Sequence, residues 1–517
     1  MKLQKFDAII IGAGMAGLVS AALLSQRGFR VVVLERDIHP GGCAASFERG
    51  GYRFAVGATV GMGLEPGGLL DRIYQQLKMR PAYVAQTPAM RVHLEDRQVQ
   101  LYTERADWLA EVLRVFPGQE DQKLSFWQDM AKTAQIMYRA SKQFPVLPIK
   151  HPADLWDSLR AAHPAQLALL PILKQTVEQR LARYGIKDTA HKTFIDGQLL
   201  DSMQTTSEGC VLPNGALALD IYRNGCQYKL GGLSTIAEDF VSAVKASEGQ
   251  IHYATRAKSM GRVSKNVLGV STNRGDYEAP VVIGAIPLSN TASLWQGSSE
   301  LKDRSAKQGK MWGAFTLYLG VEEDCLPRDA FCFEQISNAA IKEEGGNILV
   351  SLSLSQDETR APSGKRAVTV STHVDADKWT QLAKNKEVYQ QEKALLEKRM
   401  LDQVERIFPK LREGLEVCYS GSPKTFENFT LRYDGKVGGF PQTVAHANLN
   451  APSHRTDIKG LFLAGDTIFP GQGLLGTSIS GFNAARSATR YLNSLSFRSF
   501  TSPWYRNGKQ RRKELLT

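Results

Sequence analysis

A chain of 517 residues that is 43% hydrophobic can bury a large core, and it is too long for one compact domain, so two domains are expected. Its six cysteines form no C-x-x-C pair, which argues against a disulfide framework and a zinc site and fits a reducing cytosol. The net charge of +12 allows anionic partners, but no nucleic-acid-binding motif accompanies it, so no nucleic acid is expected as a partner.

The first predicted unit is a strand, a tight turn, a helix and a second strand at residues 6–35. The apolar run at 6–11 is typical of a strand buried on both faces, and the turn after it carries the G-x-G-x-x-G pattern. Its three glycines permit the turn, the approach of a pyrophosphate and close packing of the helix, and Glu35 is placed to accept hydrogen bonds from ribose hydroxyls. The cofactor contacts expected in this unit are Gly12, Gly14, Ala16, Gly17, Glu35 and Arg36.

A second glycine cluster follows at once, at residues 39–59. A nicotinamide dehydrogenase would normally present a catalytic residue soon after the first unit. Here Gly41 and Gly42 would instead let the backbone pass close to an extended diphosphate and ribityl chain, and Gly57 is expected on the same side. The pattern therefore favours FAD over NAD.

The stretch at 79–225 is predicted to be rich in helices. Its segment 144–181 mixes apolar clusters with Trp156 and with basic residues such as Lys150 and Arg160. An amphipathic entrance lying in a bilayer interface would suit a substrate that dissolves only in lipid. Ordinary core helices are the commoner explanation of such a pattern.

The next segments return the chain to the cofactor and then build a second sheet. A Gly-Gly turn, a helix and a strand at 229–260, followed by a buried strand at 277–287, place Ala257 near the adenine. Alternating strands at 314–323, 347–355 and 366–374 predict a sheet over the substrate side. The spacing of Leu396, Met400, Val404 and Ile407 indicates a helix that packs by one face.

Near the end of the chain, a buried strand at 458–466 ends in a carboxylate and leads into a glycine loop. Asp466 is expected to accept a hydrogen bond from the ribityl or pyrophosphate end of the cofactor. A helix expected to start near Thr477 would point its positive end at the flavin N1/C2=O side. The contacts expected here are Gly465, Asp466, Gly473, Gly476 and Thr477.

Four stretches of the chain resemble the FAD-dependent phytoene desaturase superfamily, most closely its carotenoid 3′,4′-desaturase and carotenoid isomerase branches. They are "GGCAASFERGGYRFAVGATVGMGLEPGG" at 41–68, "RAPSGK" at 360–365, "SPKTFENFTLRYDGKVGG" at 422–439 and "FPGQG" at 469–473. The resemblance extends to about residue 492. "FPGQG" is similar to the isomerases and "GLEPGG" to the desaturases, whereas Ala55 stands where the family usually has an aspartate.

The resemblance implies an α/β fold, with a Rossmann-like FAD-binding domain of the glutathione-reductase type, also called the two-dinucleotide-binding family, and an interleaved α+β substrate domain. The FAD-binding domain is expected at 1–75, 228–295 and 418–495. The substrate and membrane-entry domain is expected at 76–227 and 296–417, followed by a basic tail at 496–517.

The implied function is desaturation of a carotenoid, with hydride passing to flavin N5 and a proton to a base. Glu65 and Glu48 are the candidate catalytic residues because they lie beside the flavin-approaching loops. The final electron acceptor, oxygen or a quinone, stays open. One alternative is a carotenoid cis-trans isomerase that uses reduced FAD. A flavin-free binding protein similar to GDP-dissociation inhibitors is another, whereas no covalent-flavin motif or aromatic cage supports amine oxidation.

The tail adds an expectation about location. Residues 498–513 hold six basic side chains against one nearby acidic side chain, Glu514, and the longest aliphatic run outside the N-terminal unit, at 167–173, is too short to span a bilayer. Contact with an anionic membrane surface would make the protein cytoplasmic and peripheral on the inner face of the cell membrane. A solvated terminus is the alternative explanation.

Overall fold

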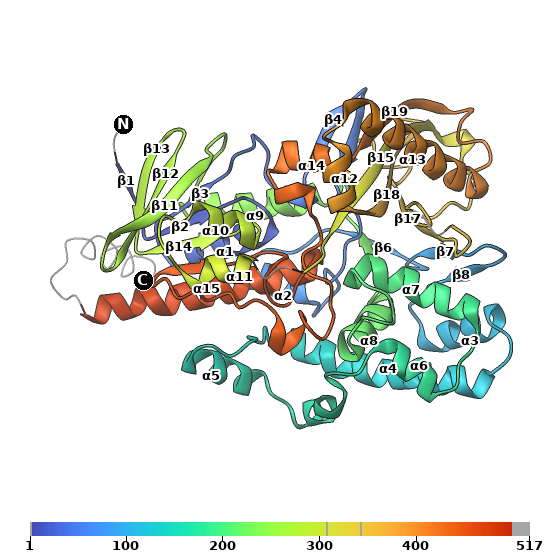
Figure 1. Cartoon of the computed structure of the whole chain (residues 1–517), viewed down its shortest axis with the longest axis horizontal. Coiled ribbons are helices and arrows are strands. Elements are labelled where there is room, and N and C mark those ends of the chain that lie inside the picture. The colour runs from blue at the N-terminus through green and yellow to red at the C-terminus, as the bar shows by residue number, and fades with distance from the viewer. Residues whose placement is uncertain (1–2, 307–308, 342–343, 499–517) are drawn as a thin grey trace.

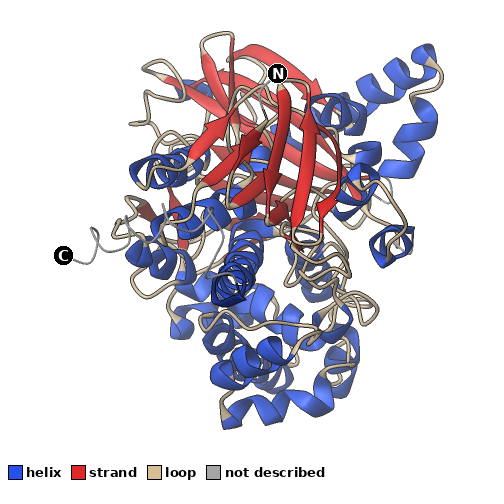
Figure 2. Cartoon of the chain, turned by 90° about the vertical axis from the view of Figure 1, so that its left-hand side faces the viewer, coloured by secondary structure: helices blue, strands red, loops and turns tan. Residues whose placement is uncertain are grey.

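The computed structural model describes residues 3–306, 309–341 and 344–498, which form a mixed α/β fold. A four-stranded sheet and a seven-stranded sheet lie on opposite sides of the molecule, and helices fill most of the space below them (Figures 1 and 2). The central sheet is parallel and has five strands in the order β10-β3-β2-β14-β20. Its strands are β2 (Ala8–Ile11), β3 (Val31–Leu34), β10 (Gln250–His252), β14 (Val281–Gly284) and β20 (Leu461–Leu463).

The central sheet is covered on both faces, which explains its uninterrupted apolar strands. Ile10 and Val33 pack under the helices α1 (Met15–Gln26), α9 (Ser234–Ala246) and α15 (Gly473–Arg498). Ile9 and Val32 point the other way, into a cluster shared with a four-stranded sheet. That sheet consists of β1 (Gln4–Lys5), β11 (Ala257–Ser264), β12 (Val267–Thr272) and β13 (Gly275–Ala279).

Helices α1 and α15 pack tightly against each other, although they lie far apart in the sequence (Figure 1). Ser20 Oγ donates a hydrogen bond to the Gly481 carbonyl at 2.9 Å. A Cβ on Gly481 would stand 2.3 Å from the Ala16 carbonyl oxygen, so only glycine allows this approach. The prediction that α15 starts near Thr477 is wrong by about one turn, because the helix begins at Gly473 and includes Gly476 in its first turn.

A seven-stranded sheet forms the second lobe, at the upper right of Figure 1, in the order β19-β15-β18-β17-β16-β7-β8. The three predicted strands are present, and the predicted helix is α13, which buries Leu396, Met400 and Val404 against the sheet. The strands are β7 (Arg91–His93), β8 (Gln98–Gln100), β15 (Trp312–Glu322), β16 (Phe333–Ser337), β17 (Asn347–Leu352), β18 (Lys365–Asp375) and β19 (Leu415–Gly421). The helices nearby are α12 (Ala376–Leu382), α13 (Lys386–Ile407) and α14 (Pro423–Thr430).

The helix-rich stretch predicted at 79–225 is confirmed, and most of it lies below the seven-stranded sheet (Figure 1). Trp108, Trp127 and Phe194 are buried at its centre. Its helices are α3 (Arg105–Val115), α4 (Glu120–Ser141), α5 (Pro152–Ala161), α6 (Val177–Arg183), α7 (Thr189–Met203) and α8 (Leu212–Asp220), with 3-10 helices η2 (Pro164–Ile172) and η3 (Ile221–Asn224). Further elements are α2 (Leu69–Gln76) and the short strands β4 (Ser46–Arg49), β5 (Tyr52–Ala55), β6 (Val84–Gln86) and β9 (Cys226–Tyr228).

Three details differ from the expected element and domain limits. The strand expected at 277–287 is two strands, β13 and β14, divided at Pro280. The limit at 418 falls inside β19, which pairs with β15 in the second sheet. The limit at 295 precedes α11 (Glu300–Ala306), which packs on α10 (Leu288–Leu294) beside the central sheet.

In the three described ranges, no helix has the length and apolar character needed to cross a bilayer. Most of the basic tail, from residue 499 on, lies outside the described residues.

Candidate cofactor and substrate site

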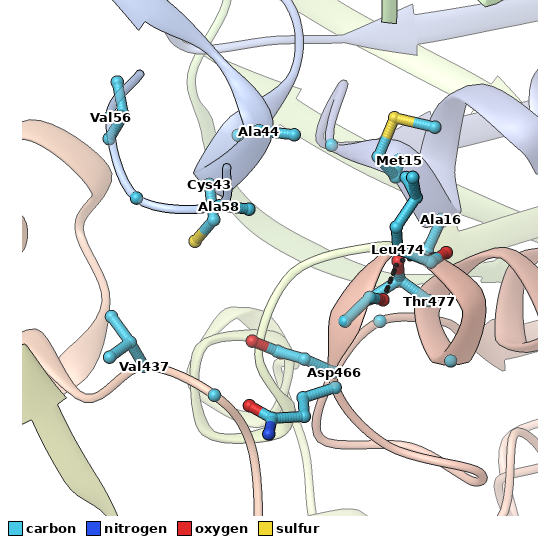
Figure 3. A pocket seen from close by; sticks show the side chains of 18 of the residues that line it. Met15, Ala16, Cys43, Ala44, Val56, Ala58, Val437, Asp466, Leu474 and Thr477 are labelled. Atoms are coloured by element: carbon cyan, nitrogen blue, oxygen red, sulfur yellow. Dashed lines mark hydrogen bonds between the residues drawn. The ribbon is translucent and has the colours of Figure 1, made fainter. Parts of the chain in front are cut away.

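A cavity of about 1300 Å³ runs from the glycine turns of the central sheet to the second sheet and the helical region. Figure 3 shows its cofactor side, where α1, the segment around Cys43 and Ala58, and the start of α15 face one another. A typical small-molecule pocket measures roughly 300–1,000 Å³. The larger volume here leaves room for a cofactor together with a substrate.

The first glycine turn forms one wall of the cavity. Gly12 has φ of +102°, and a Cβ there would stand 2.9 Å from the Ala285 carbonyl oxygen, so the turn requires glycine. Gly17 does not line the cavity; a Cβ on Gly17 would stand 2.1 Å from the Gly12 carbonyl oxygen. The expectation that Gly17 contacts the cofactor therefore finds no support in the cavity lining, because Gly17 packs against the turn, whereas Gly14 and Ala16 face the cavity.

Glu35 lies at the end of β3 and is fixed by two backbone amides. Its Oε2 accepts from Ala13 N at 2.6 Å, and its Oε1 accepts from Asp37 N at 2.8 Å. Burial raises the pKa of this carboxyl group, although both amide contacts oppose the change. Each oxygen keeps a further lone pair for a hydroxyl donor, as a ribose contact needs. Arg36 lies beside it, also at the cavity.

The second glycine cluster closes against the first. The Gly41 amide donates to the Ala13 carbonyl at 2.8 Å, and a Cβ on Gly42 would stand 3.2 Å from Gly14 Cα. Gly57 and Ala257 also line the cavity. Ala55, which replaces the usual family aspartate, is buried on β5 and lies outside the lining.

Asp466 and the start of α15 form the opposite wall (Figure 3). Asp466 Oδ2 lies 2.8 Å from Nη2 of Arg432, which also lines the cavity. Burial lowers the pKa of Arg432, but the interactions with Asp466 and Cys43 together outweigh that effect and raise it. Asp466 therefore has a guanidinium group as its direct partner. Arg432 was missed from the sequence because nothing in its segment marks it as a partner of Asp466.

The residues present fit an FAD molecule. A Cβ on Gly14, Gly465 or Gly473 would meet no atom within 4 Å, so open space lies against the backbone at three points of the wall. The first turn of α15, including Gly476 and Thr477, faces the same space and offers the positive end of a long helix to anionic or electron-rich groups. Glu35 supplies the acceptor for a ribose.

The two candidate catalytic carboxylates lie elsewhere. Glu48 is exposed on β4 and does not line the cavity. Glu65 is mostly buried and accepts a hydrogen bond from Tyr138, whose side chain is at the cavity while Glu65 stands behind it. Burial raises the pKa of Glu65, and the contact with Tyr138 opposes this. Neither carboxylate has direct access to the space where a substrate would bind.

Away from the glycine turns, the cavity is lined mainly by apolar side chains, with a few polar exceptions. The apolar group includes Val60, Met62, Met90, Met137, Leu217 and Ile221. The exceptions that stand out are Asp201 at the end of α7, Gln204 after it and His373 on β18. Asp201 and Gln204 lie 169 or more residues before His373 in the sequence, and no motif marked any of the three.

Comparison with known proteins agrees with this site. Prolycopene isomerase of Arabidopsis thaliana is 27% identical, with 93% of this chain and 82% of that protein covered. The 1-hydroxycarotenoid 3,4-desaturase of a Flavobacterium strain is 22% identical, with 90% and 96% covered. The crystal structure of an oxidoreductase from Methanosarcina mazei superposes with a TM-score of 0.64 at 16% identity, with 93% of this chain and 100% of that chain covered, which shows a shared fold.

The resemblance inferred from the motifs is confirmed by these relatives. The model of the flavin containing amine oxidoreductases matches residues 15–489. This match supports an enzyme with FAD as its cofactor and argues against the flavin-free alternative. Because the match covers nearly the whole chain and includes Glu35, the second glycine cluster and Asp466, the chain belongs to the flavin containing amine oxidoreductase family.

Proposed function

We propose that this protein is an FAD-dependent enzyme that converts a carotenoid, and that its reaction is cis-trans isomerisation of the polyene. The observation that carries the proposal is the 27% identity to a prolycopene isomerase over 93% of the chain, against 22% to a carotenoid desaturase. The motifs taken alone favour desaturation. The higher identity over the whole chain puts isomerisation first.

The shape and lining of the cavity support a long apolar substrate. One continuous space joins the cofactor turns to Met90 and Leu217 in the helical region, and most of the side chains along that route are apolar. A polyene gains affinity from such a lining by removal of apolar surface from water. Bound flavin would supply the capacity to accept or return a hydride, which carries two electrons.

The residues of this chain would hold the cofactor in a fixed register. Glu35 would bind the adenosine ribose, and the backbone at Gly14 and Gly42 would lie against the pyrophosphate. Asp466 would accept a hydrogen bond from the ribityl chain. Arg432 would hold Asp466 in its orientation. The parallel central sheet and the glycine turn that follows β2 support a Rossmann-like domain of the glutathione-reductase type.

We divide the chain accordingly into two interleaved domains. The FAD-binding domain would comprise 1–75, 228–306 and 422–495. The substrate domain would comprise 76–227 and 309–421, so that α11 joins the first domain and all of β19 joins the second.

Desaturation is the second candidate, because "GLEPGG" and "RAPSGK" are similar to the desaturase branch. An anaerobic single turnover with prolycopene and with acyclic carotenoids separates the two reactions. An isomerase would be inert with oxidised FAD and active with pre-reduced FAD, and its product mass would equal the substrate mass. A desaturase would bleach the visible absorbance of oxidised FAD as the substrate loses two hydrogens, and would later need an acceptor such as oxygen or a quinone. Failure with every carotenoid would refute both candidates.

We also propose that the protein binds the surface of an anionic membrane through α5 and η2. Helix α5 has its polarity reversed: Asp154 and Asp157 are buried, whereas Trp156 and Leu159 are 59% and 58% exposed. Leu155 on α5 and Leu167 and Leu170 on η2 are also exposed, as are the basic residues Lys150, Arg160 and Lys174 of the same segment. Exposed apolar side chains together with basic ones suit the interface of an anionic bilayer.

The cavity reaches the segment that leads into α5. Ser141 and Pro145 line it, and α5 begins at Pro152. A lipid-dissolved substrate could therefore enter from the bilayer at this end. The basic tail would add to the same attraction, at about 1 kcal/mol for each basic residue near the surface. The location would then be cytoplasmic, on the inner face of the cell membrane.

Sedimentation with vesicles of phosphatidylglycerol and phosphatidylcholine tests this membrane proposal. The variant Trp156→Ser with Leu159→Ser should bind less and keep its FAD. Deletion of residues 497–517 should also weaken binding, more so at low salt than at high salt. The matched control is Leu395→Ser, which is 52% exposed on α13 in the other lobe. If the control, the α5 variant and the wild type bind vesicles equally, α5 does not contribute to the membrane contact.

A further inference from the structure

A carboxyl group and an imidazole face each other in the wall of the cavity, in the half that the glycine turns do not form. Asp201 lies near the end of α7 and His373 lies on β18, and both line the cavity. His373 Nδ1 is 3.5 Å from Asp201 Oδ1. Neither residue belongs to the cofactor motifs, and a hydrocarbon substrate would offer neither of them a hydrogen bond.

Asp201 is held rigidly by neutral amides from three other elements. Asn347 Nδ2 on β17 donates to Oδ1 at 3.0 Å, and Gln335 Nε2 on β16 donates to Oδ2. Gln472, just before α15, donates to the backbone carbonyl of Asp201 at 3.2 Å. This last contact ties Asp201 directly to the loop that opens the flavin-facing helix.

His373 is oriented from its far side. Gln204 Nε2 lies 2.9 Å from His373 Nε2, so the ring nitrogen accepts and the proton of the neutral imidazole sits on Nδ1, which faces Asp201. Within the described residues, Nδ1 of His373 and Oε1 of Gln204 are buried and have no hydrogen-bond partner at normal distance. Buried polar atoms without a partner cost free energy, and their presence here points to a role in function.

The protonation states follow from burial. Burial raises the pKa of Asp201 to about 7 and lowers the pKa of His373 to about 4. Tyr222 on η3 also interacts with Asp201, and burial raises the pKa of its hydroxyl, so it stays neutral. The cluster thus contains one group that exchanges its proton near neutral pH, beside a neutral imidazole whose Nδ1 faces it at 3.5 Å.

We propose that Asp201 exchanges a proton with the bound carotenoid and that His373 positions Asp201 for this step. The inference rests on the isomerisation proposed above. The carboxyl proton of Asp201 bonds to one carbon of the cis double bond, using the electron pair of that bond, and the positive charge spreads along the remaining polyene. Rotation about the resulting single bond follows. The same carbon then returns a proton to the Asp201 carboxylate, and the double bond re-forms in the trans geometry without change of mass or oxidation state.

Isomerisation of prolycopene in D₂O tests the proposal through the isotope as well as the rate. Because the protonated carbon can return either isotope, the wild type should place deuterium in its product, measured by mass spectrometry. Asp201→Asn should lose about 10²–10⁴-fold in rate, as expected for removal of a general acid, together with the deuterium, while FAD absorbance per chain stays unchanged. The matched control is Asp196→Asn on the same helix, where the carboxylate accepts from Ser207 N at 2.7 Å and does not line the cavity. It should keep both the rate and the label.

The role of His373 is tested by the pH profile. Asp201 must be protonated to act, so the wild-type rate should fall as pH rises through about 7. Replacing His373 by leucine removes the polar ring that faces the Asp201 carboxyl group at 3.5 Å. The less polar surroundings should raise the pKa of Asp201 and move the fall in rate to higher pH. If the rate falls but the pH profile does not move, His373 has only a structural role, and the proposal that it positions Asp201 for the proton exchange is overturned.

The outcomes separate this inference from the proposed function. A wild type that converts prolycopene without deuterium in the product, or an Asp201→Asn variant with normal rate and label, would overturn the inference and leave the isomerase. Loss of FAD from Asp201→Asn along with its activity would also overturn it, since the residue would then support the fold. A wild type inactive on prolycopene, with full FAD, would overturn both.

Discussion

Arg490 on α15 donates two hydrogen bonds of 2.6 Å to the two carboxylate oxygens of Asp157 on α5. Arg486, one turn earlier, has its Nε 3.1 Å from the same carboxylate, and Arg455 pairs with Asp154. The buried face of α5 is therefore ionic, and its apolar face is left outside. The helix that presents its positive end to the cofactor also holds, near its other end, the surface proposed to meet the membrane.

Asp157→Ala should release α5 from the rest of the protein. The change leaves two arginines without their partner, and breaking a buried ion pair typically costs about 3–5 kcal/mol. We expect faster limited proteolysis within residues 148–175 and a lower melting temperature, with FAD still bound. Asp107→Ala, exposed on α3, is the control. An Asp157→Ala variant cleaved no faster than the control would show that the ion pairs do not hold α5.

Removal of Asp466 should weaken retention of FAD. A buried hydrogen bond to the ribityl or phosphate end contributes about 1–3 kcal/mol, so Asp466→Ala should raise the dissociation constant for FAD by roughly 5- to 150-fold. Glu35→Ala should do the same at the adenosine end. Fluorescence titration of apoprotein with FAD measures both. Unchanged affinity in the two variants would refute the cofactor placement.

Arg432→Met should destabilise the fold as well as the cofactor site, because the Asp466 carboxylate would stay buried without its partner. The double variant Arg432→Met with Asp466→Asn removes that charge and should recover part of the lost stability. Thermal unfolding of the four proteins in this cycle gives the coupling. Additive effects would show that the 2.8 Å contact between the two residues contributes nothing.

The cofactor half of the site could be predicted because its turns need backbone conformations and close approaches that only glycine allows. Gly12 needs a positive φ and Gly17 needs to lie against Gly12, and such demands leave a spaced pattern in the sequence. Asp201, His373 and Arg432 could not be found in this way. They come from α7, β18 and the loop after α14, and only tertiary packing brings them to one cavity.

Two local errors have the same origin. The stretch at 470–476 reads as a loop because glycines have low helix propensity, yet α15 starts at Gly473, since packing against Gly471 and α1 outweighs propensity. The segment around Trp156 reads as a core helix because its apolar residues are evident. Its arginine partners, Arg455 and Arg490, are about 300 residues away and are invisible to a local pattern.

Gly481→Val should force α1 and α15 apart. A Cβ there would stand 2.3 Å from the Ala16 carbonyl oxygen, and overpacking of this kind costs about 1–3 kcal/mol or more. Because Ala16 lines the cavity, FAD affinity should fall with the melting temperature. Asn493→Ala, exposed on the same helix, should change neither. A Gly481→Val variant with normal stability would contradict the close packing of the two helices.

The stability of the protein should depend on pH through Asp201. Its pKa is about 7 in the folded protein and ~3.9 in an unfolded chain, so between these values the folded state holds a proton that the unfolded state has lost. This contribution is fully present below pH ~4 and is lost as pH rises through about 7.

The variant Asp201→Asn has no such titration. Relative to wild type, the variant should therefore gain about 1–4 kcal/mol in free energy of unfolding between pH 4 and pH 8. Thermal unfolding of FAD-saturated protein across this range measures the difference, and Glu48→Gln, exposed on β4, should give a difference that does not vary with pH. A flat difference for Asp201→Asn as well would mean that Asp201 is ionised throughout, which leaves it without a proton to donate at neutral pH.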